Sequence, residues 1–372
     1  MAKKVLLGLS GGVDSAVSAY LLKEAGYEVT GCFMRNWDAM ANDDVLGNPT
    51  LDDPQCPQEK DYDDAKLVAE KLAIPLLRVD FVEEYWRDVF QYALAEYRAG
   101  RTPNPDIFCN KYIKFSAFLD YAKQNGFDLI AMGHYAKKIE KNGLFYLLKA
   151  DDHNKDQSYF LSQIAQEQLA SCLFPLGNIK KAQVRAIAQQ LQLTSVMNKK
   201  DSTGICFIGE RHFKAFLQNY LPAHQGAIVD ITTQKVLGQH DGVLYYTIGQ
   251  RKGLGIGGIP GHHDQGWFVV DKDVGKNVLY VASGEDNDYL SSQGVIINQL
   301  NWISEPPQVG KIYQAKFRYR QEDQLVQVSA LDDEHITLSF VHPVKAITPG
   351  QAAVLYQDDI CLGGGIIVKA IK

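Results

Sequence analysis

The chain has 372 residues, with 38 Lys and Arg against 44 Asp and Glu, so its formal net charge is −6, and 46% of its residues are hydrophobic. This composition is typical of a globular protein, and the length predicts two or three domains that each bury a core. No apolar run approaches the roughly 18 residues of a membrane helix. The first apolar stretch is too short for a secretory signal, so we expect a cytoplasmic protein that binds no membrane.

The first two hundred residues alternate short apolar runs with amphipathic stretches. The apolar runs predict strands over residues 5–9, 29–34, 74–81 and 129–132, and the amphipathic stretches predict helices over residues 16–25, 61–73 and 83–97. Strands that alternate with helices form βαβ units. The sequence therefore predicts an α/β fold whose N-terminal domain, residues 1–209, is a doubly wound parallel sheet.

From about Gly226 the helical periodicity fades, and β-rich runs separated by turn signals replace it. These runs predict strands over residues 243–247, 267–270, 278–281, 316–319 and 365–368. The polar stretch 283–288 lies between two groups of such runs. We therefore expect a small β-rich domain over residues 210–285 and a C-terminal β-barrel over residues 286–372.

The charge is unevenly distributed along the chain. Residues 1–100 carry 10 basic and 18 acidic side chains, a balance of −8, whereas residues 101–200 carry 14 basic and 8 acidic side chains, a balance of +6. A basic region on an acidic body can hold a polyanion, although solvated lysines on helix surfaces produce the same pattern. Charge alone leaves these two interpretations open.

The six cysteines are scattered and form no C-x-x-C pair and no zinc spacing with histidine. A disulfide scaffold and a structural zinc site are therefore excluded, and we expect no metal held by a protein ligand set. The cysteines are Cys32, Cys56, Cys109, Cys172, Cys206 and Cys361.

The most informative segment has the sequence GLSGGVDS, residues 8–15, and joins the first predicted strand to the first predicted helix. Small residues let backbone N–H groups converge on an anion, and the helix N-terminus adds the positive end of its dipole. The segment lacks both the Gly-Lys-Ser/Thr of the Walker loop and the G-x-G-x-x-G fingerprint. It closely resembles the pyrophosphate loop of the ATP pyrophosphatases, which adenylate an oxygen and release pyrophosphate.

Two lone cysteines lie in loops beside positive charge. Cys109 follows the two X-Pro bonds of TPNPDIFCNK, residues 102–111, at a predicted helix start, and Cys206 lies in DSTGICFIG, residues 201–209, after a pair of lysines. A lone cysteine is more often a small buried hydrophobic residue than a nucleophile. Positive charge and a helix N-terminus favour the thiolate, so the surroundings of both favour reactive thiols.

These segments, together with GHY at residues 133–135, KDQSYF at 155–160 and GQRKGLG at 249–255, resemble the bacterial-type tRNA-specific 2-thiouridylase family over nearly the whole chain. The resemblance implies that ATP, with Mg²⁺, activates O2 of a wobble uridine in tRNA and that a persulfide sulfur then displaces the adenylate. Adenylation turns a poorly leaving carbonyl oxygen into a good leaving group, which explains why ATP use and sulfur transfer occur together.

The resemblance also assigns roles to residues. The ATP-binding residues would be Gly8, Leu9, Ser10, Gly11, Gly12, Val13, Asp14 and Ser15 for the phosphates, and Met34 and Gly133 beside adenine and ribose. Cys206 would carry the persulfide, and Cys109 would attack or resolve it, ending as a disulfide with Cys206 or assisting sulfide release. Asp106 would act as general acid or base beside the flipped uracil.

The tRNA contacts implied by the resemblance come from five segments of the chain. They are Asn104, Pro105, Asp106, His134, Lys155, Asp156, Gln157, Arg318, Tyr319 and Gln351. His134, which follows a predicted strand, is equally compatible with a structural hydrogen bond. Arg318 and Tyr319 have the chemistry for phosphate binding and base stacking, but an exposed strand would also carry them.

Two other classes of protein remain as alternatives. An ATP-dependent ligase for small molecules would share the phosphate loop but would need no pair of thiols. A nonenzymatic RNA-binding or sulfur-carrier protein would need no intact SGGVDS. A thiouridylase also requires an upstream sulfur-relay protein or cysteine desulfurase, which the sequence does not identify.

Overall fold

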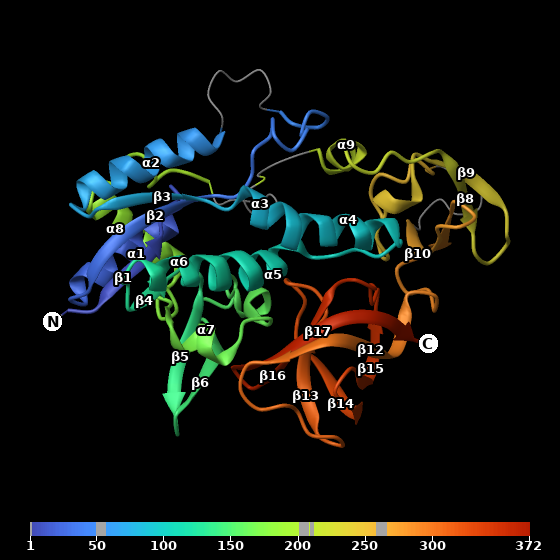
Figure 1. The fold of residues 1–372 in the computed structure, drawn as a ribbon. Helices are drawn as coiled ribbons and strands as arrows, with labels where there is room; N and C mark the ends of the chain where they lie inside the picture. Colours follow the sequence, from blue (N-terminus) through green and yellow to red (C-terminus); the bar gives the residue numbers. More distant parts are fainter. Residues whose placement is uncertain (1, 50–56, 201–207, 209–211, 258–265) are drawn as a thin grey trace.

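The structure is a computed structural model that describes residues 2–49, 57–200, 208, 212–257 and 266–372 (Figure 1). Its N-terminal part is a five-stranded sheet with the order β3-β2-β1-β4-β7, and all neighbouring pairs are parallel. The strands are β1 (Lys4–Gly8), β2 (Glu28–Arg35), β3 (Leu76–Asp80), β4 (Leu129–Ala131) and β7 (Cys172–Leu173). The predicted doubly wound parallel sheet is confirmed.

Helices cover both faces of this sheet. Successive side chains along each strand point to opposite faces, and the apolar ones on each face pack against a different set of helices. One face packs against α1 (Val13–Glu24), α2 (Pro57–Lys71) and α8 (Lys181–Gln190). The other face packs against two long helical stretches. The first consists of α3 (Val82–Tyr85), η1 (Trp86–Phe90) and α4 (Gln91–Arg98), and the second of α5 (Pro105–Phe108), η2 (Cys109–Ala117) and α6 (Phe118–Gln124). The segments η1 and η2 are π-helical, a local widening that is frequent at functional sites.

A central β-rich module follows, with a four-stranded sheet in the order β10-β11-β8-β9. Its elements are α9 (Phe213–Gln218), β8 (Gly226–Asp230), β9 (Val236–His240), η4 (Val243–Tyr245), β10 (Trp267–Asp273) and β11 (Val278–Ser283). The strand predicted over residues 243–247 is wrong, since residues 243–245 form the 3-10 helix η4. Gly242 turns the chain there with a φ of 144°, and the buried Tyr245 hydroxyl donates to the Leu221 carbonyl.

The C-terminal module is a closed six-stranded barrel in which β12 pairs with both β15 and β17. Its strands are β12 (Ser291–Trp302), β13 (Ile312–Lys316), β14 (Gln324–Leu331), β15 (Ile336–Lys345), β16 (Ala352–Gln357) and β17 (Ile360–Ile371). The prediction over residues 316–319 is wrong beyond Lys316, where β13 ends and the chain bends.

The N-terminal part contributes a hairpin to the barrel sheet that the sequence did not predict. It consists of β5 (Ala136–Lys141) and β6 (Leu144–Lys149), and β6 pairs with β17 through Leu148 and Ile360. Three short elements follow: η3 (Ser158–Leu161), α7 (Gln166–Ala170) and the strand β7.

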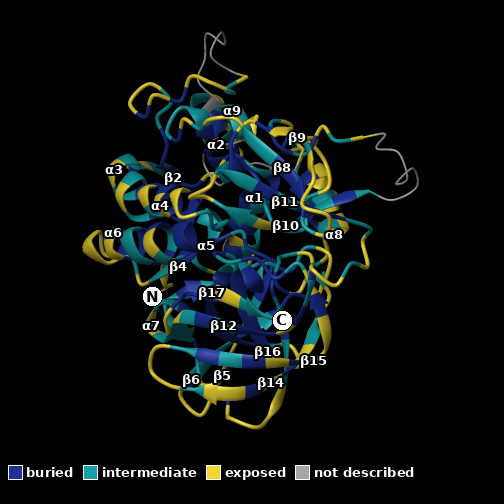
Figure 2. Cartoon of the chain, turned by 90° about the vertical axis from the view of Figure 1, so that its right-hand side faces the viewer, coloured by how far each residue is buried: buried dark blue, intermediate teal, exposed yellow. Residues whose placement is uncertain are grey.

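One hydrophobic cluster joins the three parts, beside separate clusters on the other face of the sheet and inside the barrel. The largest hydrophobic cluster extends from Met34 on the sheet through the helices to barrel residues such as Val354 and Tyr356. Figure 2 shows this continuity as buried ribbon between the sheet and the barrel, with exposed segments at the outer loops. Within the described ranges, no helix is both long and apolar enough to cross a membrane.

Candidate functional site

The GLSGGVDS loop lies at the carboxyl edge of the parallel sheet. It leaves β1 at Gly8 and enters α1 at Val13, and the strand order reverses at β1, where β2 lies on one side and β4 on the other. Ligands of doubly wound sheets bind outside the carboxyl ends of the strands at such a switch point. Gly12 caps α1 without a side-chain hydrogen bond, so the amide groups of this helix end face the loop.

The conformation of the loop depends on small residues. Gly11 has a φ of 70°, and a Cβ at this position would collide with the carbonyl oxygen of Asp61 in α2. The Ser15 hydroxyl donates to the Gly12 carbonyl at 3.0 Å and lies 3.2 Å from both the backbone nitrogen and the hydroxyl of Ser10. A larger residue at position 11 would open this turn.

Three further glycine and methionine contacts close the sides of the loop. A Cβ on Gly8 would lie 3.0 Å from Met34 Cε and 2.9 Å from Met132 Sδ, so both thioethers pack over the end of β1. A Cβ on Gly133 would lie 3.2 Å from the backbone nitrogen of Ser15. The structure therefore places Met34 and Gly133 beside the phosphate loop, and their expected contacts with adenine and ribose stay a prediction.

Asp14 is held by two partners that sequence reasoning missed. Lys181 Nζ of α8 donates to both carboxylate oxygens of Asp14 at 2.8 Å, and the Tyr135 hydroxyl donates to Oδ1 at 2.7 Å. Lys181 is 167 residues from Asp14 in the sequence, so no local signal could have identified it. The Lys181 ammonium also places a positive charge beside the loop that is expected to hold an anion.

Lys199 ties a distant segment to the same loop. Its Nζ donates to the Gly11 carbonyl at 3.0 Å, to Asp61 at 2.5 Å and to Asp64 at 2.8 Å. Burial alone would lower the pKa of Lys199, but the two carboxylates outweigh burial and raise it. The following residues, 201–207 with Cys206, lie outside the described residues. The described chain thus reaches the phosphate loop seven positions before Cys206.

The second candidate region is the start of the long helical stretch at α5. Asn104 caps it, since its Oδ1 accepts from the backbone nitrogen of Asp106 at 3.2 Å, and Pro105 occupies the first helical position. Asp106 is half-buried, whereas Cys109 has no exposed surface. Cys109 begins the π-helical segment, and Lys111, whose pKa burial lowers, donates to Gln163.

Contacts from both β modules fix the residues before Asn104. The Thr102 amide donates to the Pro349 carbonyl at 2.9 Å, and Gln351 Nε2 donates to the carbonyls of Thr102 at 2.8 Å and Pro103 at 3.4 Å. The hydroxyls of Thr102 and Thr247 lie 3.4 Å apart. We call residues 102–103 the hinge strap. It touches the barrel and the central module directly before the residues expected to hold the base.

The expected tRNA contacts around β4 have partners inside the protein. Asp156 is buried and accepts from the Ala150 and Ser158 amides and from the Ser158 hydroxyl, and burial raises its pKa. Gln157 exchanges hydrogen bonds with the backbone of Tyr135. His134 is buried beside the Phe115 and Phe174 rings; burial and the Lys114 charge lower its pKa, so its ring is neutral. Lys155 is half-buried on the loop before Asp156.

The expected contacts in the barrel lie at a junction between modules. Arg318 Nη2 donates to the Ile248 carbonyl of the central module, to the Ala346 carbonyl and to the Thr348 hydroxyl. Tyr319 is half-buried and its ring packs on Phe160, with centroids 4.3 Å apart. The structure thus gives Arg318 and Gln351 bridging contacts within the protein, which the sequence analysis did not anticipate.

The remaining described cysteines are buried in apolar surroundings. Burial raises the pKa of the Cys32 and Cys361 thiols to about 12 and raises that of Cys172 further. Thiols of this kind are inert as nucleophiles at neutral pH. Within the described residues, no group of three or more His, Cys, Asp and Glu side chains is placed to hold a metal ion.

The chain is similar to known proteins over its whole length. Residues 3–210 match the family described as tRNA methyl transferase HUP domain, residues 214–283 the tRNA methyl transferase PRC-barrel domain, and residues 292–367 the aminomethyltransferase beta-barrel domain. Its relatives include proteins that bear the name tRNA-specific 2-thiouridylase MnmA. The protein from Mycoplasma capricolum subsp. capricolum is 56% identical and that from Mycoplasma mycoides subsp. mycoides SC 57%, with 100% of both chains covered. The protein from Pectobacterium carotovorum subsp. carotovorum is 51% identical, covering 100% of this chain and 98% of its own.

Proposed function

The chain belongs to the tRNA-specific 2-thiouridylase family, and we propose how its two candidate regions divide the reaction between them. The protein is an enzyme that uses ATP to form 2-thiouridine in tRNA. The phosphate loop activates O2 of the wobble uridine by adenylation, and Cys206 and Cys109 then deliver sulfur to C2. The roles of individual residues below are part of the proposal.

The loop fits the phosphates of ATP. Its turn at Gly11, the uncapped N-terminus of α1 and the Lys181 ammonium all favour a bound anion. Mg²⁺ is usually held by one or two carboxylates together with substrate phosphates, and Asp14, a third exposed, is the carboxylate that this loop offers. A bound Mg²⁺ would neutralise phosphate charge, and Lys181 would then share Asp14 with it.

Sulfur delivery begins with a persulfide on Cys206. Its terminal sulfur attacks C2 of the adenylated base, the C2–O2 bond breaks, and AMP leaves with the electron pair. The Cys109 thiolate then attacks the Cys206 sulfur, which releases 2-thiouridine and leaves a Cys109–Cys206 disulfide for an external thiol to reduce. Release of the sulfur as sulfide with the help of Cys109 is the alternative route. Asp106, half-buried next to the cap of α5, handles the accompanying proton.

The observation that carries this proposal is the Lys199 contact. It fastens the chain that leads to Cys206 onto Gly11 of the phosphate loop and onto α2. A sulfur donor that must reach an adenylated base needs a tether of this kind between the donor segment and the nucleotide loop. Lys199 lies seven residues before Cys206 in the sequence.

Substrate tRNA would lie across the region with the +6 balance, residues 101–200. We propose that Lys155 contacts the tRNA backbone and that Tyr319 stacks against a tRNA base. Asn104 and Pro105 would line the pocket for the target base. Asp156, Gln157 and His134 would contribute by shaping the loop around Lys155. Direct contacts from Arg318 or Gln351 would require these side chains to exchange their present partners. A sulfur-relay protein or cysteine desulfurase would load Cys206.

The proposal is tested by supplying the purified protein with ATP, a sulfur source and tRNA, with amino acids in place of tRNA, or with neither. Pyrophosphate release only with tRNA, together with 2-thiouridine found by mass spectrometry of the digested tRNA, is the expected result. Release stimulated by an amino acid would instead identify a small-molecule ligase. No pyrophosphate release under any condition, with tRNA still bound, would identify a carrier.

The redox partner of Cys206 gives a second test. After removal of reductant, peptide mapping should find a bridge between Cys109 and Cys206, with Cys32, Cys56, Cys172 and Cys361 unbridged. Exchange requires a thiolate, which the raised pKa values of Cys32, Cys172 and Cys361 suppress, and it also requires access, so the completely buried Cys109 has to become accessible for the bridge to form. A different pairing would contradict the assigned roles.

A further inference from the structure

Asn36 is a completely buried residue whose side-chain amide makes no hydrogen bond. It follows β2, has 0% exposed surface, and neither its Nδ2 nor its Oδ1 has a partner within the described part of the chain. Buried polar side chains are almost always paired, because an unpaired buried amide weakens the folded state. An amide left unpaired in this way is therefore expected to serve a ligand.

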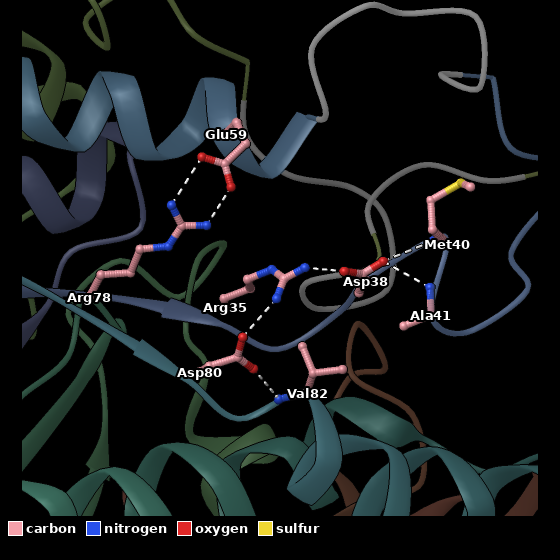
Figure 3. A network of polar contacts seen from close by, with 8 residues as sticks. All are labelled: Arg35, Asp38, Met40, Ala41, Glu59, Arg78, Asp80 and Val82. Atoms are coloured by element: carbon pink, nitrogen blue, oxygen red, sulfur yellow. Dashed lines mark hydrogen bonds and ion pairs between the residues drawn. The ribbon is translucent and has the colours of Figure 1, made fainter.

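The residues next to Asn36 in the sequence have hydrogen-bond partners, although Asn42 Nδ2 further along this segment is buried and unpaired as well. Figure 3 shows Arg35 bridging Asp38 and Asp80, and Asp38 accepting from the Met40 and Ala41 amides. The Trp37 indole N–H donates to Asp44 at 3.1 Å. The backbone on both sides of Asn36 is thus fixed, and the amide is held in place with its hydrogen-bonding groups unused.

Asn36 also lies at the edge of the sheet where a ligand is expected. It comes two residues after Met34, whose methyl group packs against Gly8 at the start of the phosphate loop. Two other buried polar atoms near this edge are unpaired as well: Nδ1 of His134, which follows β4, and Oδ1 of Asn110, which follows Cys109. Unpaired buried polar atoms thus occur beside both candidate regions, and also elsewhere in the described chain, for example at Ser162, Ser292 and Ser304.

We propose that the Asn36 amide binds the edge of a nucleobase, with Nδ2 donating to an acceptor of the base and Oδ1 accepting from a neighbouring N–H group. This inference rests on the proposed function, which brings two such bases to the site. Adenine of ATP presents an amino group beside a ring nitrogen, and uracil of tRNA presents its N3–H beside O4. Asparagine pairs in this two-point manner with adenine in other proteins.

The first experiment replaces the amide by an apolar group of similar size, Asn36→Leu. Because an unpaired buried amide contributes nothing to folding, we expect the melting temperature to stay the same or to rise. Asn301→Leu is the matched control, since Asn301 Nδ2 donates to the carbonyls of Ser162 and Ile164. The control should melt at a lower temperature and keep its nucleotide affinity. A drop for Asn36→Leu as large as that of the control would overturn the proposal.

The second experiment identifies the base. Its first measurement compares two nucleotides on the wild-type protein, so it does not depend on a variant that folds. If adenine is the ligand, the wild-type protein should bind ATP roughly 10 to 100 times more tightly than purine riboside triphosphate, which lacks the amino group, and Asn36→Leu should remove this difference. If uracil is the ligand, ATP binding should not change. The single-turnover rate of thiolation by Asn36→Leu should then fall by a similar factor, with tRNA affinity kept by its phosphate contacts.

Equal ATP binding, equal discrimination between the two triphosphates and equal thiolation by wild type and Asn36→Leu would refute the role of Asn36. This result is distinct from a failure of the proposed function, in which the wild-type protein itself would form no 2-thiouridine.

Discussion

The phosphate loop and the Cys109 region are built in opposite ways. The turn of the loop at Gly11 and the bonds between Ser10, Gly12 and Ser15 arise within eight consecutive residues, and its distant contacts, from Lys181 and Lys199, come from the same N-terminal part. The Cys109 region depends on the hinge strap, which the central module and the barrel hold from 145 to 249 residues away in the sequence. Changes in the β modules should therefore affect sulfur transfer without affecting the nucleotide loop.

The largest effect is expected for Cys206→Ser. A serine cannot carry a persulfide, so the formation of 2-thiouridine should be lost completely. Adenylation depends on the loop at residues 8–15, so tRNA-dependent formation of AMP should continue. The measurement is AMP and 2-thiouridine in the same reaction, with Cys361→Ser as a control that keeps both. Loss of AMP formation in a folded Cys206→Ser protein would show that the two regions are not separable.

Asp14→Ala should give the opposite result. The variant removes the carboxylate that Lys181 and Tyr135 hold at the loop. We expect ATP cleavage to slow by about 10²- to 10³-fold, because the removal of one group that stabilises charge in an active site usually lowers the rate by this factor. Persulfide should still form on Cys206, which mass spectrometry of the intact protein can follow. Failure to form the persulfide would mean that the loop also organises the sulfur-carrying segment.

The difference between contacts that are near and far in the sequence also explains how much of the structure could be predicted. The parallel sheet and the position of the loop between β1 and α1 follow from short-range patterns, the alternation of strands and helices and the GLSGGVDS segment. The strand predicted over residues 243–247 failed because apolar composition does not reveal that Gly242 turns the chain into a 3-10 helix.

What the sequence could not predict depends on partners far away in the chain. The hairpin of β5 and β6 joins the barrel through β17, more than 200 residues later, and no local sequence pattern predicts that pairing. Lys181 and Lys199 reach the loop from 167 and 188 residues away. Arg318 was expected to contact tRNA from a strand over residues 316–319, but it lies beyond β13 and bridges the two β modules.

Gln351→Ala tests the long-range half of the comparison. The variant removes both Gln351 side-chain bonds to the hinge strap and leaves the bond between the Thr102 amide and the Pro349 carbonyl, so Asp106 and Cys109 should be held less accurately. We expect kcat for thiolation to fall about tenfold, with little change in KM for tRNA or in ATP affinity. Gln327→Ala is the matched control, because Gln327 Nε2 donates to the Gly310 carbonyl on the exposed side of the barrel. An increase in KM with an unchanged kcat would instead make Gln351 a tRNA contact.

The smallest effect concerns the salt dependence of tRNA binding. Contacts with phosphates release counterions, so a protein that neutralises six or more of them should lose on the order of a thousandfold in affinity between 50 and 200 mM salt. Lys155→Ala should make this slope shallower by roughly one unit without changing the melting temperature. Arg318→Ala should instead lower the melting temperature, because it leaves the acceptors of Ile248, Ala346 and Thr348 without this donor. The loss should reduce the free energy of unfolding by about 1 to 3 kcal/mol.

The slope for Arg318→Ala should equal that of the wild-type protein, because its Nη2 group is already used between the modules. An equal reduction of the slope in both variants would show that the Arg318 guanidinium also meets a phosphate, and would place the junction of the β modules on the tRNA surface. A flat salt dependence in the wild-type protein would exclude residues 101–200 as an electrostatic site for RNA. The two variants thus separate a side chain that meets the substrate from one that holds the modules together.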